Sequence, residues 1–310
     1  MINQTHNCIS SLANRCSSQL NVDISTPRLN HLLDSWLDED LGRGDLANIA
    51  LIKQQGSACW TANQKGIFCG GMLAERIFQR LDTSIRVNLL LKDGEYLKKG
   101  QRLLELQGPA AALASGERTA LNLAMRLSGI ATATAFLVKE LEGTSVQLAD
   151  TRKTTPGLRI LEKYAFRCGG GTNHRFGLDD AAMLKENHIA WAGGIHAAVQ
   201  AVKAEAPWTS KIIVEAETPE QAEEAIHAGA DGILLDEIAP EQLHSLVPNL
   251  RHLASIRSKD EGSKEIVLEA SGIDPKFLKA YAKTGIDLIS TSAPITRSAW
   301  IDFSMRFETS

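Results

Sequence analysis

The sequence predicts an α/β protein in which a small β-rich lobe precedes a parallel α/β barrel. Short strand-like runs separated by turn signals fill residues 57–107, and after residue 145 short apolar runs alternate with amphipathic helical stretches. Such alternation is typical of a parallel sheet covered by helices. Each apolar run ends in polar side chains. Because the carboxyl ends of barrel strands line one mouth, we expect a functional site there.

The first half of the chain contains a leader, a helix, the β-rich lobe and a long helix. Residues 1–25 are rich in Ser, Asn and Gln and predict a loose leader. Apolar residues then recur at helical spacing, at Leu29, Leu32, Leu33, Trp36 and Leu37. The Asp93-Gly94 pair predicts a tight turn between strands, and ERTALNLAMRLSGIATATAFLVKELE predicts a long helix. We assign residues 26–144 to the N-terminal lobe.

The second half supplies the predicted barrel strands, which are SVQLAD, KIIVEAE, DGILLDE, EIVLEAS and IDLISTS. Neither GxGxxG nor GxxxxGK[ST] follows the first strand, which argues against a doubly wound nucleotide-binding sheet. We therefore assign residues 145–310 to a barrel that carries the active site. The last strand or strands of the chain can return to the first lobe.

The composition indicates a soluble protein whose substrates bind at local charge clusters. The formal net charge of -4 gives no general attraction to nucleic acid or to anionic membranes. The five cysteines form no CxxC pair, so we expect neither a disulfide framework nor a zinc site. We also expect no signal peptide and no membrane-spanning segment, and hence a cytoplasmic location.

Basic residues concentrate after the first predicted barrel strand. Arg152-Lys153 lies in DTRKTTPG, His174-Arg175 in CGGGTNHRFGL, and Lys185 in MLKENHI. An arginine fork binds carboxylate or phosphate through two hydrogen bonds, and a lysine supplies a compact charge. The alternative is a solvated loop, a flexible glycine turn and a surface lysine. Together the cations predict a substrate with several negative charges.

Carboxylates and hydroxyls end the later strands. Glu215 and Glu217 alternate along one strand and therefore project to one face, and Asp236 ends the next strand. These acids predict either a Mg²⁺ site that holds pyrophosphate oxygens or a salt-bridged barrel interior. Ser271-Gly272 and Ser290-Thr291-Ser292 offer donors to a phosphate, although small residues at strand ends are also common in plain turns.

Several long motifs resemble those of the quinolinate phosphoribosyltransferase family, also called carboxylating nicotinate-nucleotide pyrophosphorylase. They are LDEDLGRGDL, SGERTALNLAMRLSGIAT, DTRKTTPGLR, CGGGTNHRFGL, LKENH, VEAE, ILLDE and LEASG. The resemblance runs from about residue 30 to the C-terminus and leaves the leader uncovered. It implies an N-terminal α/β sandwich lobe packed on an incomplete, about seven-stranded TIM-like α/β barrel.

The resemblance also implies the reaction. Phosphoribosyl transfer from phosphoribosyl pyrophosphate to quinolinate, with decarboxylation, gives nicotinate mononucleotide, pyrophosphate and CO₂ for NAD biosynthesis. Mg²⁺ is the implied cofactor. The implied quinolinate-binding residues are Arg118, Arg152, His174, Arg175 and Lys185, with Arg118 reaching the neighbouring site of a homodimer or higher homo-oligomer.

The remaining implied roles concern catalysis and phosphate binding. Lys153, Lys185, Glu217 and Asp236 are the implied catalytic residues, and Glu217 and Asp236 also face the ribose hydroxyls and the Mg²⁺–pyrophosphate group, directly or through water. Ser271, Gly272 and Ser292 correspond to the 5′-phosphate loops.

The sequence departs from the usual family pattern at the phosphate end. Glu237 stands where the family usually has Asn, Ile273 where it often has Gly, and Ser292 where Gly is usual. Two other hypotheses fit a barrel of this kind. One is a related phosphoribosyltransferase with an unknown acceptor, such as the molybdenum-operon-associated homologues. The other is a catalytically dead barrel kept as a binding module.

Overall fold

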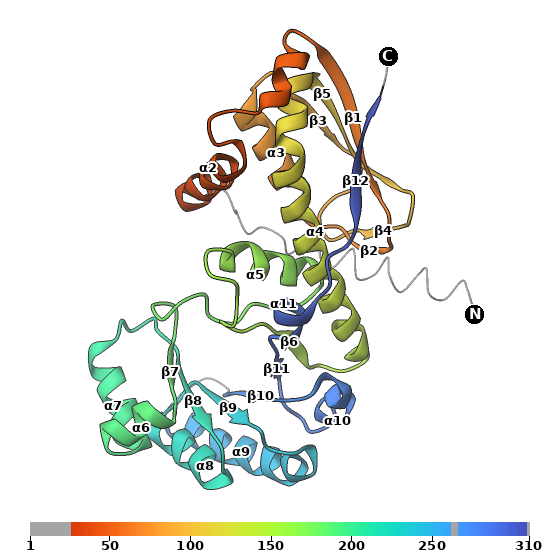
Figure 1. Ribbon diagram of the computed structural model, residues 1–310. Helices are drawn as coiled ribbons and strands as arrows, with labels where there is room; N and C mark the ends of the chain where they lie inside the picture. Colours follow the sequence, from red (N-terminus) through yellow and green to blue (C-terminus); the bar gives the residue numbers. More distant parts are fainter. Residues whose placement is uncertain (1–25, 262–265, 309–310) are drawn as a thin grey trace, which may run out of the picture. The chain divides into compact units, whose positions relative to one another are not determined.

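The computed structural model describes residues 26–261 and 266–308, without the side chains of residues 258–261. Contacts divide the chain into two units (Figure 1). Unit 1 is formed by the residues up to Phe136, by Thr154–Gly171 and by the residues from Pro294 onward. Unit 2 is formed by Leu137–Lys153 and Thr172–Ala293. The predicted leader, residues 1–25, lies outside the described residues, and the division at residues 144 and 145 stays a prediction.

Unit 1 is built around a four-stranded sheet in the order β12-β1-β5-β3, in which all neighbours are antiparallel. Its strands are β1 (Gln55–Ala62), β3 (Arg86–Leu89), β5 (Arg102–Pro109) and β12 (Phe303–Glu308). The short strands β2 (Gly66–Ile67) and β4 (Tyr96–Leu97) form a separate pair. The last strand of the chain therefore pairs with the first, with Trp60 opposite Met305.

Two helices of unit 1 begin at side-chain caps. Helix α2 (Pro27–Leu41) starts at Thr26, whose hydroxyl accepts the Leu29 N–H at 3.2 Å. Helix α3 (Gly71–Leu81) starts where the Asp93 carboxylate accepts the N–H groups of Gly70 and Gly71 at 3.0 and 2.9 Å. Asp93 thus satisfies a helix N-terminus in addition to preceding the glycine of a turn. The short 3₁₀ helix η1 (Leu46–Leu51) lies between α2 and β1.

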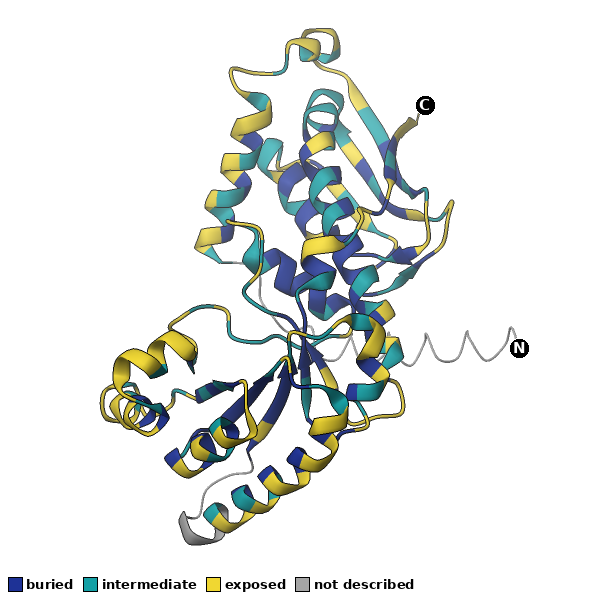
Figure 2. Ribbon diagram, turned by 60° about the horizontal axis from the view of Figure 1, so that its bottom comes forward, coloured by how far each residue is buried: buried dark blue, intermediate teal, exposed yellow. Residues whose placement is uncertain are grey.

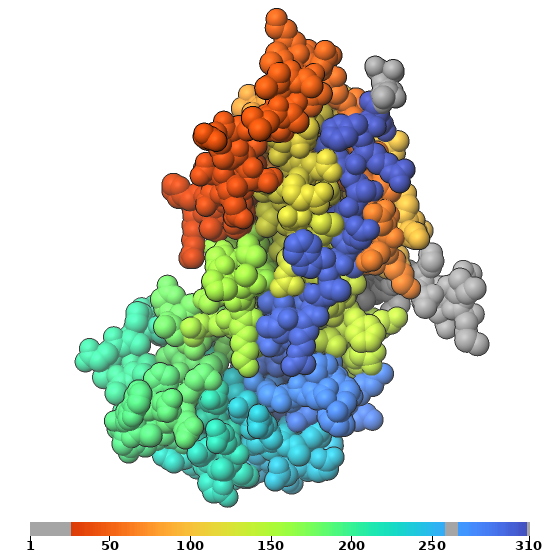
Figure 3. All heavy atoms as spheres, viewed as in Figure 1, coloured from red at the N-terminus to blue at the C-terminus, as the bar shows by residue number. Residues whose placement is uncertain are grey.

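Helix α4 (Ala110–Glu140) is the long helix that the sequence predicts. By length and apolar composition alone it could cross a membrane, but half of its most apolar window is buried inside the protein. Its Ser128 hydroxyl binds both the N–H and the carbonyl of Cys69. Ile301 donates to the Met125 carbonyl at 3.1 Å, and Figure 3 shows the blue C-terminal segment along this yellow helix. These contacts are those of a core helix.

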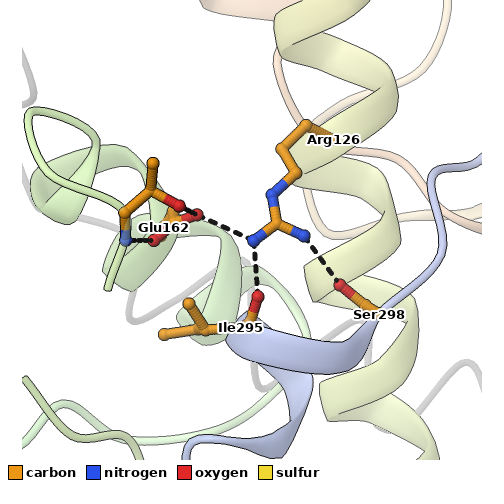
Figure 4. A network of polar contacts seen from close by, with 5 residues as sticks. Arg126, Glu162, Ile295 and Ser298 are labelled. Atoms are coloured by element: carbon orange, nitrogen blue, oxygen red, sulfur yellow. Dashed lines mark hydrogen bonds and ion pairs between the residues drawn. The ribbon is translucent and has the colours of Figure 1, made fainter. Parts of the chain in front are cut away.

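A buried ion pair joins α4 to helix α5 (Arg159–Cys168) (Figure 4). Arg126 donates to the Glu162 carboxylate at 2.8 Å, to the Ser298 hydroxyl at 3.2 Å and to the Ile295 carbonyl. Glu162 is fully buried and also accepts the N–H and the hydroxyl of Thr155, each at 2.8 Å. The Glu162 carboxylate therefore holds the start of the segment Thr154–Gly171, and the Arg126 guanidinium holds the start of the segment from Pro294 onward.

Unit 2 contains a six-stranded parallel sheet in the order β6-β11-β10-β9-β8-β7. The strands are β6 (Gln147–Ala149), β7 (Ala182–Leu184), β8 (Ile212–Ala216), β9 (Gly232–Asp236), β10 (Val267–Ser271) and β11 (Leu288–Ser290). The predicted α/β class and parallel second half are confirmed. In the described chain the number of strands is six instead of about seven. A single parallel bridge, Ala149 to Thr172, takes the place of a further strand after three glycines.

Helices cover the sheet of unit 2, which Figure 2 shows as buried strands beneath helices with exposed outer faces. They are α6 (Glu186–Ala192), α7 (Ile195–Glu205), α8 (Pro219–Ala228), α9 (Pro240–Glu261), η2 (Pro275–Phe277) and α10 (Leu278–Tyr281). Helix α11 (Ala293–Arg297) begins at the last residue of unit 2 and otherwise belongs to unit 1. Helix α8 illustrates the local rules. Thr218 caps its start, Pro219 occupies its first turn, and Gly229 ends it with φ +90°.

The buried ion pair generates a stability prediction. Glu162→Gln leaves the Arg126 guanidinium without its counter-charge in a buried place, so the free energy of unfolding should fall by about 3 kcal/mol. Urea denaturation followed by tryptophan fluorescence measures this. Glu308→Gln is the matched control, because it removes an exposed partner of Arg102 and should cost less than about 1 kcal/mol. Equal losses in the two variants would contradict the importance of burial.

Candidate active site

A cavity of ≈ 330 Å³ lies at the carboxyl ends of the strands of unit 2. It is lined by Asp150, Thr151, Arg152, Lys153, His174, Arg175, Met183, Lys185, Glu215, Leu234, Asp236, Glu269, Ser271 and Ser290. The lining residues of a strand are two positions apart, as with Glu269 and Ser271 on β10. The parallel register places Asp236 beside Ser271. The cavity is therefore formed by one face of the sheet.

Cations from several segments meet in this cavity. Arg152 and Lys153 follow β6, Lys185 follows β7, and Arg175 lies in the segment between them. Arg175 donates through Nη1 to the Ala181 carbonyl at 2.8 Å. Burial, and next the charge of Arg152, lower the pKa of Arg175. A bound dianion would relieve the repulsion between these two guanidinium groups.

His174 is held by two carboxylates, and Arg175 is held by the His174 ring. Asp150 is fully buried, and its carboxylate accepts the Asn173 side-chain N–H at 2.6 Å and the His174 backbone N–H at 2.8 Å. The Arg175 N–H donates to Nδ1 of His174 at 2.7 Å. The other ring nitrogen, Nε2, lies 3.2 Å from a Glu269 carboxylate oxygen. Both nitrogens of His174 thus have partners within the protein.

Glu215 and Glu217, which are two positions apart at the end of β8, lie in different surroundings. Glu215 lines the main cavity and forms an ion pair with Lys185. Glu217 is exposed and lines a neighbouring cavity of ≈ 210 Å³, together with Glu215. Strand β8 ends at Ala216, and the Glu217 N–H donates to the Gln221 side chain at 2.8 Å. The alternation that would keep Glu217 beside Glu215 stops where the strand ends.

Two of the three predicted phosphate-loop residues lie at the end of β10. Ser271 lines the cavity, and Gly272 follows it with φ +71°. A Cβ atom on Gly272 would lie 2.7 Å from Cγ of Glu237, so only glycine fits there. Glu237 itself has φ +55°, a left-handed conformation that Asn tolerates better than Glu. Ser292 lies two residues beyond the cavity-lining Ser290 and just before α11.

The remaining predicted residue, Arg118, is exposed on α4 in unit 1. Within the described residues no group of three or more His, Cys, Asp or Glu side chains is arranged to hold a metal ion. Asp236 and Ser271 still give the cavity hard oxygen donors. Mg²⁺ commonly takes one or two carboxylates and completes its shell with substrate phosphates and water. The donors present therefore fit a Mg²⁺ ion that arrives with a pyrophosphate.

Sequence reasoning missed Glu269, which lines the cavity, whereas it did name the lining residues Glu215 and Ser290 as candidate metal and phosphate contacts. Glu269 was hidden because it stands within the apolar run EIVLEAS. A signal was available, since it lies two positions before Ser271 and therefore projects to the same face. Glu215 and Glu217 are also two positions apart, but only Glu215 lies within strand β8 and lines the main cavity.

Comparisons with known proteins agree with this geometry. Residues 45–128 match the family described as "Quinolinate phosphoribosyl transferase, N-terminal domain", and residues 130–306 match its C-terminal domain. The chain is 43% identical over 276 residues to a probable nicotinate-nucleotide pyrophosphorylase [carboxylating] of Synechocystis sp., covering 88% of this chain and 90% of that protein. A human nicotinate-nucleotide pyrophosphorylase [carboxylating] is 37% identical over 281 residues, covering 89% and 90%.

Solved structures give the same result. The nicotinate-nucleotide pyrophosphorylase from Francisella tularensis superposes with a TM-score of 0.84 at 35% identity, covering 94% of this chain and 99% of that one. The corresponding protein from Ehrlichia chaffeensis gives a TM-score of 0.82 at 30% identity, covering 93% and 100%.

The left-handed residue at the phosphate end generates a second stability prediction. Glu237→Asn should raise the free energy of unfolding by about 0.5–1 kcal/mol, because Asn adopts positive φ at lower cost. Lys53→Asn is a positive control, since Lys53 has φ +67°. Glu220→Asn on the exposed face of α8 should be neutral or slightly destabilising. Urea denaturation ranks the three variants, and a loss of stability in Glu237→Asn would contradict the backbone argument.

Proposed function

This chain belongs to the quinolinate phosphoribosyl transferase family, and we infer that it catalyses the carboxylating nicotinate-nucleotide pyrophosphorylase reaction of NAD biosynthesis. Its substrates are quinolinate and phosphoribosyl pyrophosphate, and its products are nicotinate mononucleotide, pyrophosphate and CO₂. The observation that best supports this activity is the pair of neighbouring guanidinium groups, Arg152 and Arg175, in a cavity that also holds Lys153 and Lys185. Such a pair favours a dicarboxylate over a neutral acceptor.

The dicarboxylate end of the site is assigned to Arg152, Arg175 and Lys185, with His174 as their neighbour. Planar guanidinium groups match the geometry of carboxylates through paired N–H donors. Because Arg175 is already partly desolvated, less water has to be removed when the substrate binds. The Lys185 ammonium forms an ion pair with Glu215, and both residues line the cavity.

The phosphoribosyl end is assigned to residues at the later strand ends. Asp236 and one of Glu215 and Glu217 would face the ribose hydroxyls and the metal, and Lys153 would contact the pyrophosphate. Ser271, Gly272 and Ser292 would bind the 5′-phosphate. We treat Mg²⁺ as part of the substrate complex with phosphoribosyl pyrophosphate, where it neutralises charge on the leaving group.

The reaction needs no nucleophilic side chain. The lone pair of the pyridine nitrogen forms the bond to C1 of the ribose while the bond from C1 to the pyrophosphate oxygen breaks, and the leaving group takes that electron pair. Cations stabilise the charge on the departing oxygens, and a carboxylate such as Asp236 stabilises the oxocarbenium character at C1. The quaternised ring nitrogen then stabilises the carbanion that remains when CO₂ leaves, and a proton completes the product.

A coupled assay tests this function. The purified protein should convert quinolinate to nicotinate mononucleotide and release labelled CO₂ from the ring-2 carboxylate, both in strict dependence on phosphoribosyl pyrophosphate and Mg²⁺. Omission of either one is the control. If quinolinate stays intact while nicotinate is consumed, the protein is a different phosphoribosyltransferase. If neither acceptor reacts, the enzyme assignment fails.

We further propose that a homodimer is the smallest active form and that Arg118 completes the site of the neighbouring subunit. An exposed arginine on the long helix α4 supports this, since its charge is available to a second copy. We also propose a cytoplasmic location. It is consistent with Cys59, Cys69 and Cys168, which form no disulfide in the part of the chain described.

Shared sites predict complementation between inactive variants. Arg118→Ala and Arg152→Ala should each lose on the order of 2–5 kcal/mol of substrate binding, because each removes a charged, bidentate contact. Co-expression of the two should restore about a quarter of wild-type activity, since half of the dimers are mixed and each mixed dimer has one intact site. The kcat/KM of the co-purified mixture for quinolinate measures this. A mixture no more active than its components would place Arg118 outside the neighbouring site.

A further inference from the structure

Glu269 is a buried carboxylate whose function the reaction itself does not explain. It lies in the middle of β10 with 3% of its surface exposed. Its register partners on the neighbouring strands are Leu234 and Leu288, which are both apolar. A carboxylate in such surroundings is costly unless a specific partner compensates for the lost water. The burial of an acid within the strand that ends at Ser271 therefore calls for a specific role.

The partner of Glu269 is the imidazole ring of His174. One carboxylate oxygen, Oε2, lies 3.2 Å from Nε2 of His174, and the other, Oε1, is buried and has no hydrogen-bond partner among the described residues. Nδ1 of the same ring accepts the Arg175 N–H at 2.7 Å. Because Nδ1 is an acceptor, the ring proton belongs on Nε2, where it is donated to Glu269.

The contacts of the ring therefore continue into the backbone of Arg175. Asp150 fixes the backbone of His174 from the β6 side, and Glu269 fixes its ring from the β10 side. With the ring held, Nδ1 stays directed at the Arg175 amide, and the Arg175 guanidinium is tied to the Ala181 carbonyl. Asp150, directly after β6, and Glu269, on β10, thus hold the His174-Arg175 pair.

The position of the pair within unit 2 explains why it needs such support. A second cavity of ≈ 500 Å³ reaches the amino ends of the strands, at Lys211, Gly232 and Val267. The second cavity and the substrate cavity share His174, Arg175 and Glu269 as lining residues. A side chain with open space on two sides has little packing to fix it, so hydrogen bonds must set its orientation.

We propose that Glu269 is a positioning residue for dicarboxylate binding. It holds the His174 ring in the Nε2–H tautomer, and the ring in turn orients the Arg175 segment toward the substrate. The proposal rests on the proposed function, because it concerns the quinolinate end of the same site. Glu269 acts as a hydrogen-bond acceptor for the ring and does not touch the reacting atoms. Its carboxylate geometry matters more than its charge.

Steady-state kinetics of Glu269→Ala and Glu269→Gln test the proposal. The Ala variant should raise KM for quinolinate by about tenfold or more and leave KM for phosphoribosyl pyrophosphate within about threefold, because a hydrogen bond to a charged group is lost at one end of the site. The Gln variant keeps an acceptor for Nε2–H, so its KM for quinolinate should stay within about threefold of wild type. Glu220→Gln, on the exposed face of α8, is the matched control.

Each outcome of the kinetics has a definite meaning. Rescue by Gln, together with a KM effect confined to quinolinate, supports a positioning role. Equal loss of kcat in the Ala and Gln variants, with KM unchanged, overturns it and makes Glu269 a catalytic acid or an electrostatic group. An unchanged KM in the Ala variant also overturns it. If the Ala variant does not fold, a Gln variant with KM raised more than about tenfold gives the same refutation.

A spectroscopic measurement separates this inference from the proposed function. Long-range ¹H–¹⁵N correlation spectra report the tautomer of each histidine without any substrate, and His174→Gln assigns the signal. Wild type and Glu269→Gln should show the Nε2–H form, whereas Glu269→Ala should show a mixture of tautomers. Wild type in the Nδ1–H form overturns the inference even if quinolinate is turned over. An inactive wild type with the expected tautomers overturns the function alone.

Discussion

The candidate site depends on the register of one parallel sheet. Every strand of unit 2 runs in the same direction, so residues at equivalent levels lie side by side on one face. One level carries Glu215, Leu234, Glu269 and Leu288, and the next carries Asp236 and Ser271. A shift of one residue in any strand would turn its polar side chains away from the cavity. Fold and site are therefore specified by the same hydrogen-bond ladder.

Charge balance is the second constraint on this cavity. Arg152, Arg175 and Lys185 carry like charges, and burial, followed by the charge of Arg152, lowers the pKa of Arg175. Glu215 forms an ion pair with Lys185, whereas the Asp150 and Glu269 carboxylates contact the His174 segment. The acids of the cavity therefore also fix the backbone that carries Arg175. Under the proposed function, a bound dianion would place negative charge beside Arg152 and Arg175.

The fold class and the ends of the strands could be predicted from the sequence, because apolar runs and their polar ends are local signals. Strands β9 and β10 do end at Asp236 and Ser271, as the runs DGILLD and EIVLEAS indicate. The position of Glu217 could not be predicted, because its exposure depends on where β8 stops and α8 begins. The pairing of β12 with β1 is also invisible locally, since the two strands stand at opposite ends of the chain.

One departure from the family pattern, Glu237, shows how the ends of two neighbouring strands constrain each other. Glu237 occupies a left-handed conformation directly after β9, and its Cγ lies 2.7 Å from where a Cβ on Gly272 would be placed. The neighbouring strand end and the positive φ of Gly272 therefore both favour glycine after β10. Glu237 is larger than the Asn usual in the family and narrows the space above Gly272. The contacts among Asp150, His174 and Glu269 involve other residues. The proposed phosphate end can thus vary in sequence while the proposed dicarboxylate end keeps its geometry.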